Sequence, residues 1–274
     1  MNITQEPAIT IEERTRSSTQ EGTMANTYER TFVVAVPLAR AWRAFVDPKE
    51  RENYVARPGQ PGDAWEAGQL KSGVDHIPPV DIEIGQVAPM RVINYREGVR
   101  FRAAQGNDDV TDWLDVTVTF EEAGSGTRIT FTRSGFGDSE EWQLFRQSQS
   151  LGQDETLSDL VLYLETGVPV HRIRHYTPSQ GSVGASMLES ERGVEVRTVI
   201  PGGYAEEAGL RAGDVLVRLA GASVYHRSEV HAVERAYGPG AQVEVVYVRD
   251  GQVMTGEAPL SESGFTQKHG VRGA

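Results

Sequence analysis

Apolar and polar residues alternate over residues 28–36, and the apolar positions fall on one face of the segment. This spacing predicts a half-buried β-strand. Pro37 suits the first turn of a helix, and the apolar residues between Leu38 and Phe45 recur at spacings of three and four. The pattern therefore predicts a strand that is followed directly by an amphipathic helix ending near Asp47.

Several short strands and a longer helix are predicted next. Alternation indicates strands at residues 82–84, 91–95, 114–120 and 129–131, with a hairpin turn at 121–126. Apolar residues at 157–164 recur at helical spacing, and Gly167 and Pro169 mark the end of that helix. The order of strand, helix, several strands and long helix predicts an α+β domain in which a curved antiparallel sheet wraps its last helix.

A cluster of Pro, Gly and Ser at residues 178–182 marks a joint in the chain. Beyond it, the pattern predicts a strand at 193–196, a short helix at 205–210, a strand at 215–219, a helix from the N-cap Ser228 to Tyr237, and strands at 243–247 and 252–260. We expect a disordered tail at 1–24, a first domain at 25–169, a linker at 170–180, a second domain at 181–262 and a flexible tail at 263–274.

The composition narrows the classes of function. Lys and Arg number 27 against 39 Asp and Glu, and the net charge of −12 disfavours nucleic acid, which is bound through clustered cations. Cysteine is absent, which excludes disulfides and thiol catalysis. No apolar run approaches the ~18 residues of a membrane span. We expect a cytoplasmic protein without a membrane span, and we hypothesise that Met24 rather than Met1 is the initiator.

The chain shows no recognisable catalytic or metal-binding motif. His171 and His175 lie four residues apart but lack a flanking Glu, and we expect both to be exposed in the linker. The G-x-S-x-G, GxGxxG and GxxxxGK[ST] patterns are missing. We therefore predict no catalytic residue, no metal and no cofactor.

Four segments of the first domain carry a resemblance to a known superfamily. VAVPLARAWRAFVDP, VAPMRVINY, VTVTFEEAGSGTRITFTRSGFG and LSDLVLYLETGV together resemble the START-like (SRPBCC) superfamily, in its branch of homologues of the activator of heat-shock-protein-90 ATPase. The resemblance implies a helix-grip fold, in which a curved antiparallel sheet surrounds a long C-terminal helix with an apolar cavity between them. Relatives usually open that helix with Gly-Trp, whereas Gly152 is followed here by Gln153.

The resemblance implies a small hydrophobic ligand or a client surface held in that cavity. Large side chains of the first domain are the candidates for its lining, because an apolar pocket removes ligand surface from water. The predicted lining residues are Tyr54, Trp65, Met90, Tyr95, Trp113, Phe136 and Trp142.

The second domain resembles a PDZ domain of the bacterial protease-associated type. The resemblance rests on GVEVRTVIPGGYAEEAGLRAGDVLVRLAGASV and VEVVYVRDGQ, and it implies a small, partly open β-barrel with two helices. By the family's pattern, backbone N–H groups of the loop at 182–185 receive the carboxylate of a partner's C-terminal peptide, which adds to the sheet as a strand. The peptide-binding residues implied are Val183, Gly184, Ala185, Ser186, Met187 and Val230.

These features favour a non-enzymatic protein of two binding modules, one for a small hydrophobic ligand and one for a partner's C-terminal peptide. One alternative is a START-like enzyme (cyclase, dehydratase or hydrolase) that docks through its PDZ domain. It needs an acid or base in the cavity, with Asp63, Asp75, His76 and Asp112 as the available candidates. The other alternative, which rests on the branch resemblance alone, is a co-chaperone-like regulator of a heat-shock ATPase.

Overall fold

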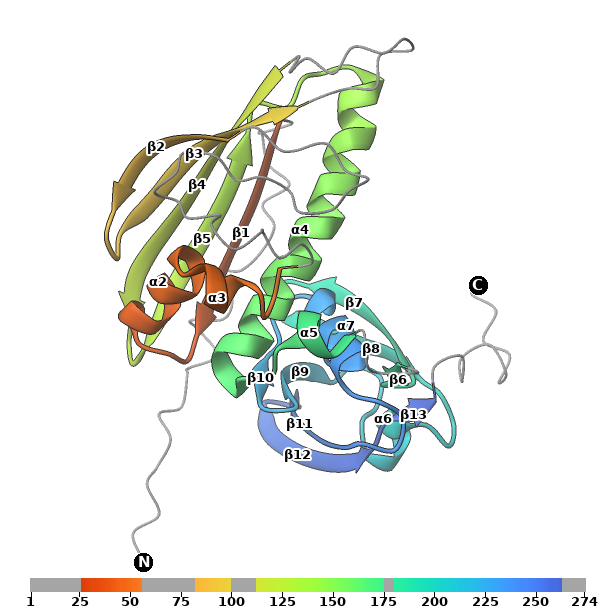
Figure 1. Cartoon of the computed structure of the whole chain (residues 1–274). Helices are drawn as coiled ribbons and strands as arrows, with labels where there is room; N and C mark the ends of the chain where they lie inside the picture. Colours follow the sequence, from red (N-terminus) through yellow and green to blue (C-terminus); the bar gives the residue numbers. More distant parts are fainter. Residues whose placement is uncertain (1–25, 56–81, 100–111, 175–179, 263–274) are drawn as a thin grey trace, which may run out of the picture. The chain divides into compact units, whose positions relative to one another are not determined.

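The computed structural model describes residues 26–55, 82–99, 112–174 and 180–262 (Figure 1). These residues divide into two compact units, with the boundary between residues 172 and 173. Each unit has its own sheet and its own core.

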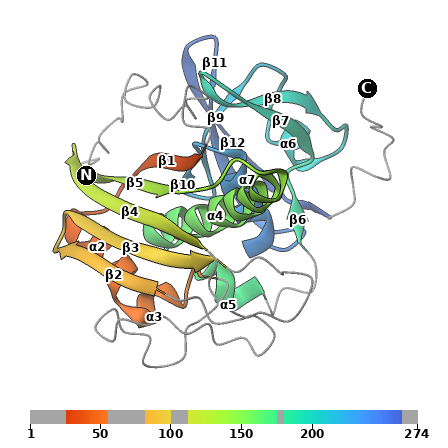
Figure 2. The ribbon, with the colours of Figure 1, turned by 90° about the horizontal axis from the view of Figure 1, so that it is seen from above.

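The first unit is a five-stranded antiparallel sheet with helices, in the sheet order β1-β5-β4-β3-β2. Figure 2 shows the long helix α4 running along the strands of this sheet. The elements are β1 (Thr27–Val34), α2 (Leu38–Val46), α3 (Pro48–Arg51), β2 (Ile82–Ala88), β3 (Val92–Val99), β4 (Asp112–Ala123), β5 (Gly126–Ser134), α4 (Glu140–Thr166) and α5 (Val170–Arg174).

The inner face of the sheet follows from the period-two alternation of its strands. In β4, Leu114, Val116, Val118 and Phe120 are all at most 4% exposed, while the residues between them face outward or are half-buried. Phe45 of α2 packs edge-on against Phe120 with ring centroids 5.1 Å apart. The predicted first strand, first helix and β4–β5 hairpin are therefore confirmed.

Helix α4 is much longer than the apolar spacing indicates. It begins at Glu140, where the Ser139 side chain accepts a hydrogen bond from the Trp142 N–H, and it ends at Gly167 with φ of 77°. Its fully buried residues all lie in the second half, between Leu157 and Leu164, whereas Trp142 and Phe145 of the first half are only partly buried. The first half is polar and largely exposed, so no apolar stripe marks it, and an opening at Gly152 is wrong.

The first unit continues past residue 169 into α5. Val170 and His171 are buried, and the His171 N–H donates to the Asn53 carbonyl at 3.1 Å. The expectation that His171 is an exposed linker residue is therefore wrong, because a backbone hydrogen bond holds it against the segment after α3. His175 lies outside the described residues.

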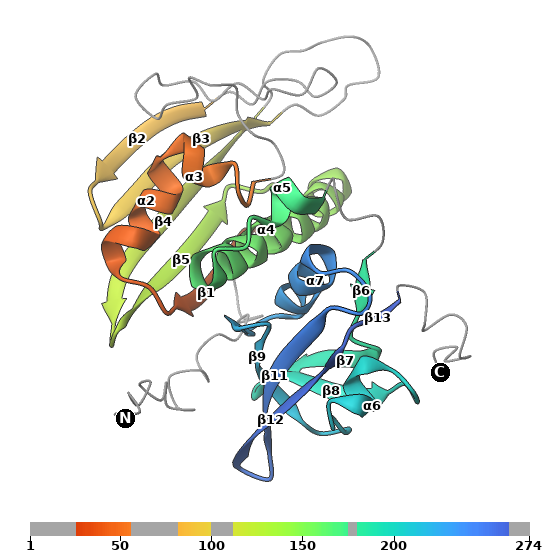
Figure 3. The same ribbon diagram turned by 60° about the horizontal axis from the view of Figure 1, so that its bottom comes forward.

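The second unit is a small, strand-rich domain whose main sheet has the order β12-β11-β9-β8-β7, with β10 paired to β9 and a separate pair of β13 and β6 (Figure 3). Its elements are β6 (Gly181–Ser182), β7 (Ala185–Ser190), β8 (Gly193–Val199), α6 (Tyr204–Glu207), β9 (Val215–Leu219), β10 (Ala222–Ser223), α7 (Arg227–Ala236), β11 (Gln242–Arg249), β12 (Gln252–Pro259) and β13 (Ser261–Glu262).

The helix α7 begins two residues earlier than the sequence pattern indicates. Its N-cap is His226 rather than Ser228: the His226 ring nitrogen accepts from the Ser228 N–H, and the Glu229 side chain accepts from the His226 N–H. This reciprocal pair is a capping box built with an imidazole, which a search for Ser, Thr, Asp or Asn overlooks. No helix in the described part of the chain is long and apolar enough to cross a membrane.

Candidate ligand cavity and peptide groove

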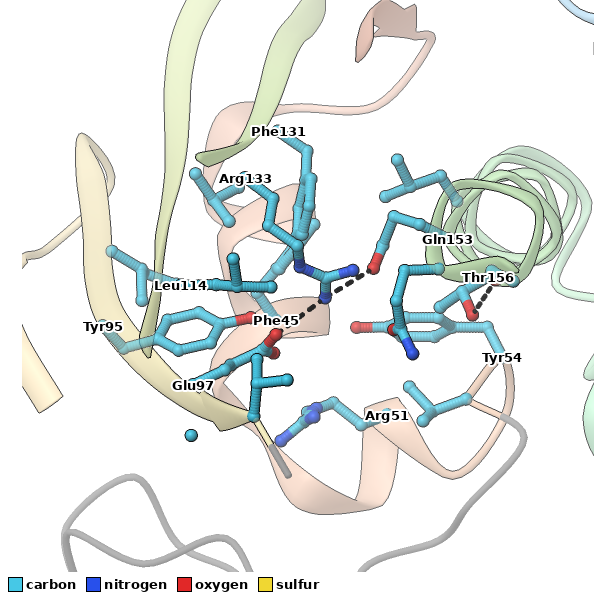
Figure 4. Close-up of a pocket in the computed structure, with 18 of the residues that line it drawn as sticks. Phe45, Arg51, Tyr54, Tyr95, Glu97, Leu114, Phe131, Arg133, Gln153 and Thr156 are labelled. Carbon is cyan, nitrogen blue, oxygen red and sulfur yellow. Dashed lines mark hydrogen bonds and ion pairs between the residues drawn. The ribbon is translucent and has the colours of Figure 1, made fainter. Parts of the chain in front are cut away.

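The first unit contains a cavity bounded by the inner face of the sheet, the segment from α2 to residue 55, and α4 (Figure 4). Its volume is about 430 Å³, which falls in the range of small-molecule sites. Much of the wall is apolar, and it includes Phe45, Ile93, Leu114, Val118, Phe131 and Leu157.

Two charged side chains from the inner face of the sheet meet in this cavity. Glu97 on β3 and Arg133 on β5 form an ion pair with 3.0 Å between Arg133 Nη2 and Glu97 Oε2. Arg133 Nη2 also donates to Gln153 Oε1 of α4 at 3.3 Å (Figure 4). The Arg133 side chain is 7% exposed, yet its Nε–H is buried and has no hydrogen-bond partner among the described residues. The cavity wall therefore includes a buried cation, one of whose donors, Nε–H, has no partner among the described residues.

A second guanidinium group lines the cavity from another side. Arg51, at the end of α3, lies across the cavity from Arg133 in Figure 4. Among the described lining residues, Glu97 is the only carboxylate against these two cations. The described lining thus carries a net positive charge in a wall that is part apolar and part polar, and it favours a ligand with an anionic or acceptor group.

The two tyrosines in the lining are protonated at neutral pH. Burial raises the pKa of Tyr54 to about 12, and its hydroxyl donates to the Ala44 carbonyl at 2.9 Å. Burial, reinforced by the nearby Glu97, raises the pKa of Tyr95 well above its usual range. Both phenols therefore stay neutral and contribute shape.

The structure places the predicted cavity residues in different parts of the first unit. Tyr54 and Tyr95 line the cavity. Phe136 and Trp142 instead pack on each other at 6.1 Å, in a cluster with Phe145. Of that cluster, Phe145 reaches the cavity.

Three predicted residues lie elsewhere. Met90 is 44% exposed in the turn between β2 and β3, where its backbone is left-handed with φ of 59°. Trp113 lies on the opposite face of β4 from the buried Leu114, and the centre of its ring lies 4.9 Å from the Arg96 guanidinium. Neither residue lines the cavity, and Trp65 lies outside the described residues.

Sequence reasoning missed the charged part of the lining. Glu97 and Arg133 occupy positions in phase with the buried residues of their strands, such as Tyr95 and Phe131. The sequence did offer a signal: a charged residue stands where the alternation of the strand places an inward-facing side chain. Such a residue indicates a buried ion pair, because a buried charge requires a partner.

In the second unit an edge strand lies next to a helix, where the PDZ resemblance implies a peptide groove. Strand β7 ends the main sheet, and α7 packs against β7 and β6 (Figure 3). The loop before β7 contains Gly184 with φ of 65°, a conformation that directs successive N–H groups toward one point. Val183 and Val230 are 1% and 3% exposed.

The predicted peptide-binding residues all lie on this loop, on β7 or on α7. Ala185 and Met187 of β7 are half-buried, whereas Ser186 is exposed and shares a 2.6 Å hydrogen bond with Thr198 of β8. The structure therefore brings the six residues into one region of the unit, as the resemblance implies, while their binding of a peptide remains a prediction.

Two N–H groups of the loop already have acceptors within the domain. The Val183 N–H donates to Glu234 Oε1 at 2.8 Å, and the Gly184 N–H donates to Ser182 Oγ at 3.2 Å. Glu234 lies one helical turn after Val230 on α7, and sequence reasoning did not single it out.

The far end of β7 is tied to the start of α7. Glu189 accepts from the Arg227 N–H at 3.1 Å and lies 2.9 Å from His226 Nε2. Burial opposes the charge of Glu189, but the hydrogen bonds and charges from His226 and Arg227 outweigh it and lower the pKa of this carboxyl. These contacts hold β7 and α7 together at one end of the groove.

Of the four candidate acids and bases, only Asp112 lies within the described residues. Asp112 is exposed at the start of β4, and it is not among the residues that line the cavity. Asp63, Asp75 and His76 lie outside the described residues. Among the residues that the structure describes, no three His, Asp or Glu side chains gather in a way that suits a metal ion.

The comparisons with known proteins agree with this division. Residues 35–165 match the family described as activator of Hsp90 ATPase homolog 1-like protein, and residues 195–249 match the PDZ domain family. The chain thus carries a domain that matches the activator of Hsp90 ATPase homolog 1-like family, followed by a domain that matches the PDZ family, and the predicted α+β fold class is confirmed.

Three relatives illustrate the extent of the similarity. The solution structure of the Aha1 dimer from Colwellia psychrerythraea is 13% identical, covers 52% of this chain and 97% of that chain, and has a TM-score of 0.40. The crystal structure of protein SSP2350 from Staphylococcus saprophyticus is 25% identical, covers 52% and 93%, and has a TM-score of 0.38. A probable periplasmic serine protease of Haemophilus influenzae is 32% identical over 65 residues, which make up 24% of this chain and 14% of that protein.

Proposed function

We propose that this protein is a two-module binding protein. Its Aha1-like domain binds a small amphipathic molecule, and its PDZ domain binds an extended peptide of a partner protein. The observation that supports the first part most directly is the cavity whose wall combines apolar side chains with the guanidinium groups of Arg51 and Arg133.

The composition of the cavity defines the class of ligand. Apolar surface removed from water contributes roughly 25 cal/mol per Å², so a hydrocarbon body gains from the wall formed by Leu114, Val118 and Phe131. An acceptor or carboxylate on the same molecule is attracted by the guanidinium groups of Arg133 and Arg51 in the cavity wall. We infer that the ligand is a small hydrophobic acid.

Binding is better supported than turnover. Glu97 is the only carboxylate in the described lining. Its ion pair with Arg133 neutralises that cation and leaves Glu97 poorly placed to accept a proton from a ligand. The tyrosines stay neutral at physiological pH because burial raises their pKa values. The described lining therefore offers groups that hold and orient a ligand, without a free general base.

Native mass spectrometry of the purified full chain tests the ligand proposal. We expect extra mass that disappears on denaturation. Thr156→Trp, which places an indole in the cavity from α4, is expected to reduce the bound fraction at least tenfold because it fills the space that the ligand needs.

Gln147→Trp is the matched control, since residue 147 is exposed on the same helix. Equal occupancy in the two tryptophan variants would contradict the cavity as the binding site. A wild-type chain without extra mass, which also fails to bind lauric acid added at millimolar concentration, would contradict the ligand proposal as a whole.

The second part of the proposal rests on the free edge of β7. An extended segment adds to this edge through main-chain hydrogen bonds, and the half-buried side chains of Ala185 and Met187 lie along the same edge. The adjacent helix α7 forms the other wall of the groove.

Gly184→Val is expected to abolish peptide capture, because a β-branched residue does not tolerate the φ of 65° that shapes the loop. The measurement is enrichment of phage-displayed random octapeptides on the immobilised full chain. Gly251→Val is the control: its φ of 77° imposes the same backbone strain, with nothing within 4 Å, at the β11–β12 hairpin. Equal enrichment on both variants would refute the groove assignment.

A further inference from the structure

The anion-binding position of the PDZ loop is occupied by a side chain of the domain itself. The Val183 N–H, on a residue that is 1% exposed, donates to Glu234 Oε1 at 2.8 Å. Water has little access to this donor, so the carboxylate of Glu234 is the group that satisfies it. A partner's terminal carboxylate, bound in the way the PDZ resemblance implies, requires the same donor.

Glu234 is held in this position from two sides. Its second oxygen, Oε2, lies 2.9 Å from His231 Nδ1, and its side chain is only 19% exposed. It projects from α7 one turn after Val230, whose side chain is buried beside the loop. The next donor of the loop, the Gly184 N–H, is engaged by Ser182 Oγ.

These contacts change what the groove accepts. A partner's terminal carboxylate can displace the Glu234 carboxylate from the Val183 N–H, which leaves Glu234 without this donor. Otherwise the terminal carboxylate has to bind directly beside the Glu234 carboxylate. Two carboxylates in one half-buried site repel each other strongly. A segment from the interior of a chain carries no terminal charge, and it needs only the backbone edge of β7, which the sheet leaves unpaired.

We propose that the PDZ groove binds an internal, extended segment of its partner and rejects free C-termini, with Glu234 as the residue that sets this specificity. The inference rests on the proposed peptide binding at β7. The occupant is a stretch of chain without a negative charge at the position that faces Glu234.

The test compares two displays of one random octapeptide library, either at a free C-terminus or inserted between two folded domains. Full-length wild-type protein is expected to enrich the internal display at least tenfold over the free-ended display. Glu234→Ala removes the competing carboxylate and is expected to raise enrichment of the free-ended display at least tenfold. Octapeptides recovered from both displays are then synthesised as acids and as amides, and their dissociation constants are measured by fluorescence anisotropy.

Two further variants secure the interpretation. Glu234→Gln keeps an acceptor for the Val183 N–H and serves if the alanine variant does not fold; an intermediate gain for free acids is expected. Glu207→Ala removes one negative charge from the exposed surface of α6, so it controls for the change in net charge of the domain. We expect it to leave the enrichment of both displays unchanged.

The outcomes separate the two proposals. Enrichment of free-ended clones on the wild type, unchanged by Glu234→Ala, would overturn the specificity inference and leave peptide binding intact. Capture of free-ended clones by Glu234→Ala, with no capture of either display by the wild type, would support the role of Glu234 and contradict peptide binding by the natural chain. No capture by any variant would overturn both.

Discussion

Replacing Asp214 with alanine is expected to lower the free energy of unfolding of the second unit by about 3 kcal/mol. The Asp214 carboxylate is 2% exposed and accepts from Arg249 at two atoms, Nε at 2.8 Å and Nη2 at 2.7 Å. It also accepts from the Arg211 N–H at 2.7 Å. One side chain therefore ties the turn before β9 to the end of β11, and its removal leaves several donors without their acceptor.

The loss of stability in Asp214→Ala depends on how well water solvates Arg249 once its partner is removed. Arg249 is 22% exposed and also donates to the Gly209 carbonyl, so part of its guanidinium reaches water after the substitution. This places the expected loss near the lower end of the ~3–5 kcal/mol for breaking a buried pair.

Hydrogen exchange in increasing urea, followed by mass spectrometry of peptides from each unit, measures the change. Protection in the first unit is expected to stay at the wild-type level because the two units have separate cores. Glu244→Ala, on the exposed face of β11, serves as the control. A loss for Asp214→Ala within 0.5 kcal/mol (about the scatter of surface substitutions) of the control would contradict the prediction.

Arg133→Met is expected to weaken binding of lauric acid by roughly 30-fold, or about 2 kcal/mol, while binding of methyl laurate changes little. The acid carries a carboxylate that interacts with the buried guanidinium, and the ester offers only a weak acceptor. Isothermal titration calorimetry of the full chain with each compound gives the two ratios.

A double variant separates ligand recognition from folding. Arg133→Met alone leaves Glu97 without its ion-pair partner at 3.0 Å, and we expect it to be less stable than the wild type. Arg133→Met combined with Glu97→Met replaces both charges with apolar groups, which restores stability but not binding of the acid. Full recovery of lauric acid binding in the double variant would show that Arg133 does not recognise the carboxylate.

The sequence by itself determined the two-domain organisation, the α+β class and most strand positions of this protein. These features depend on short-range spacing: alternation in β4 and β5, helical spacing in α2, and glycines at turns such as Gly167. The two recognised resemblances followed from such local segments, because each element carries its own pattern.

Predictions from local sequence pattern were wrong where residues elsewhere in the chain determine the position of a segment. The first half of α4 has no apolar stripe, so its start at Glu140 depends on the cap provided by Ser139 and on continuation of the buried second half. The burial of His171 likewise depends on a hydrogen bond to Asn53, a residue far away in the sequence.

Only the tertiary structure decided which charged groups meet. Glu97 and Arg133 lie on different strands, and the register of the sheet places both on its inner face, where the low polarity forces them to pair. Glu234 reaches the Val183 N–H across 51 residues because α7 packs beside the loop before β7. Hydrophobic spacing specifies which face of an element is buried, whereas the partner of a buried polar group is set by how the elements pack against one another.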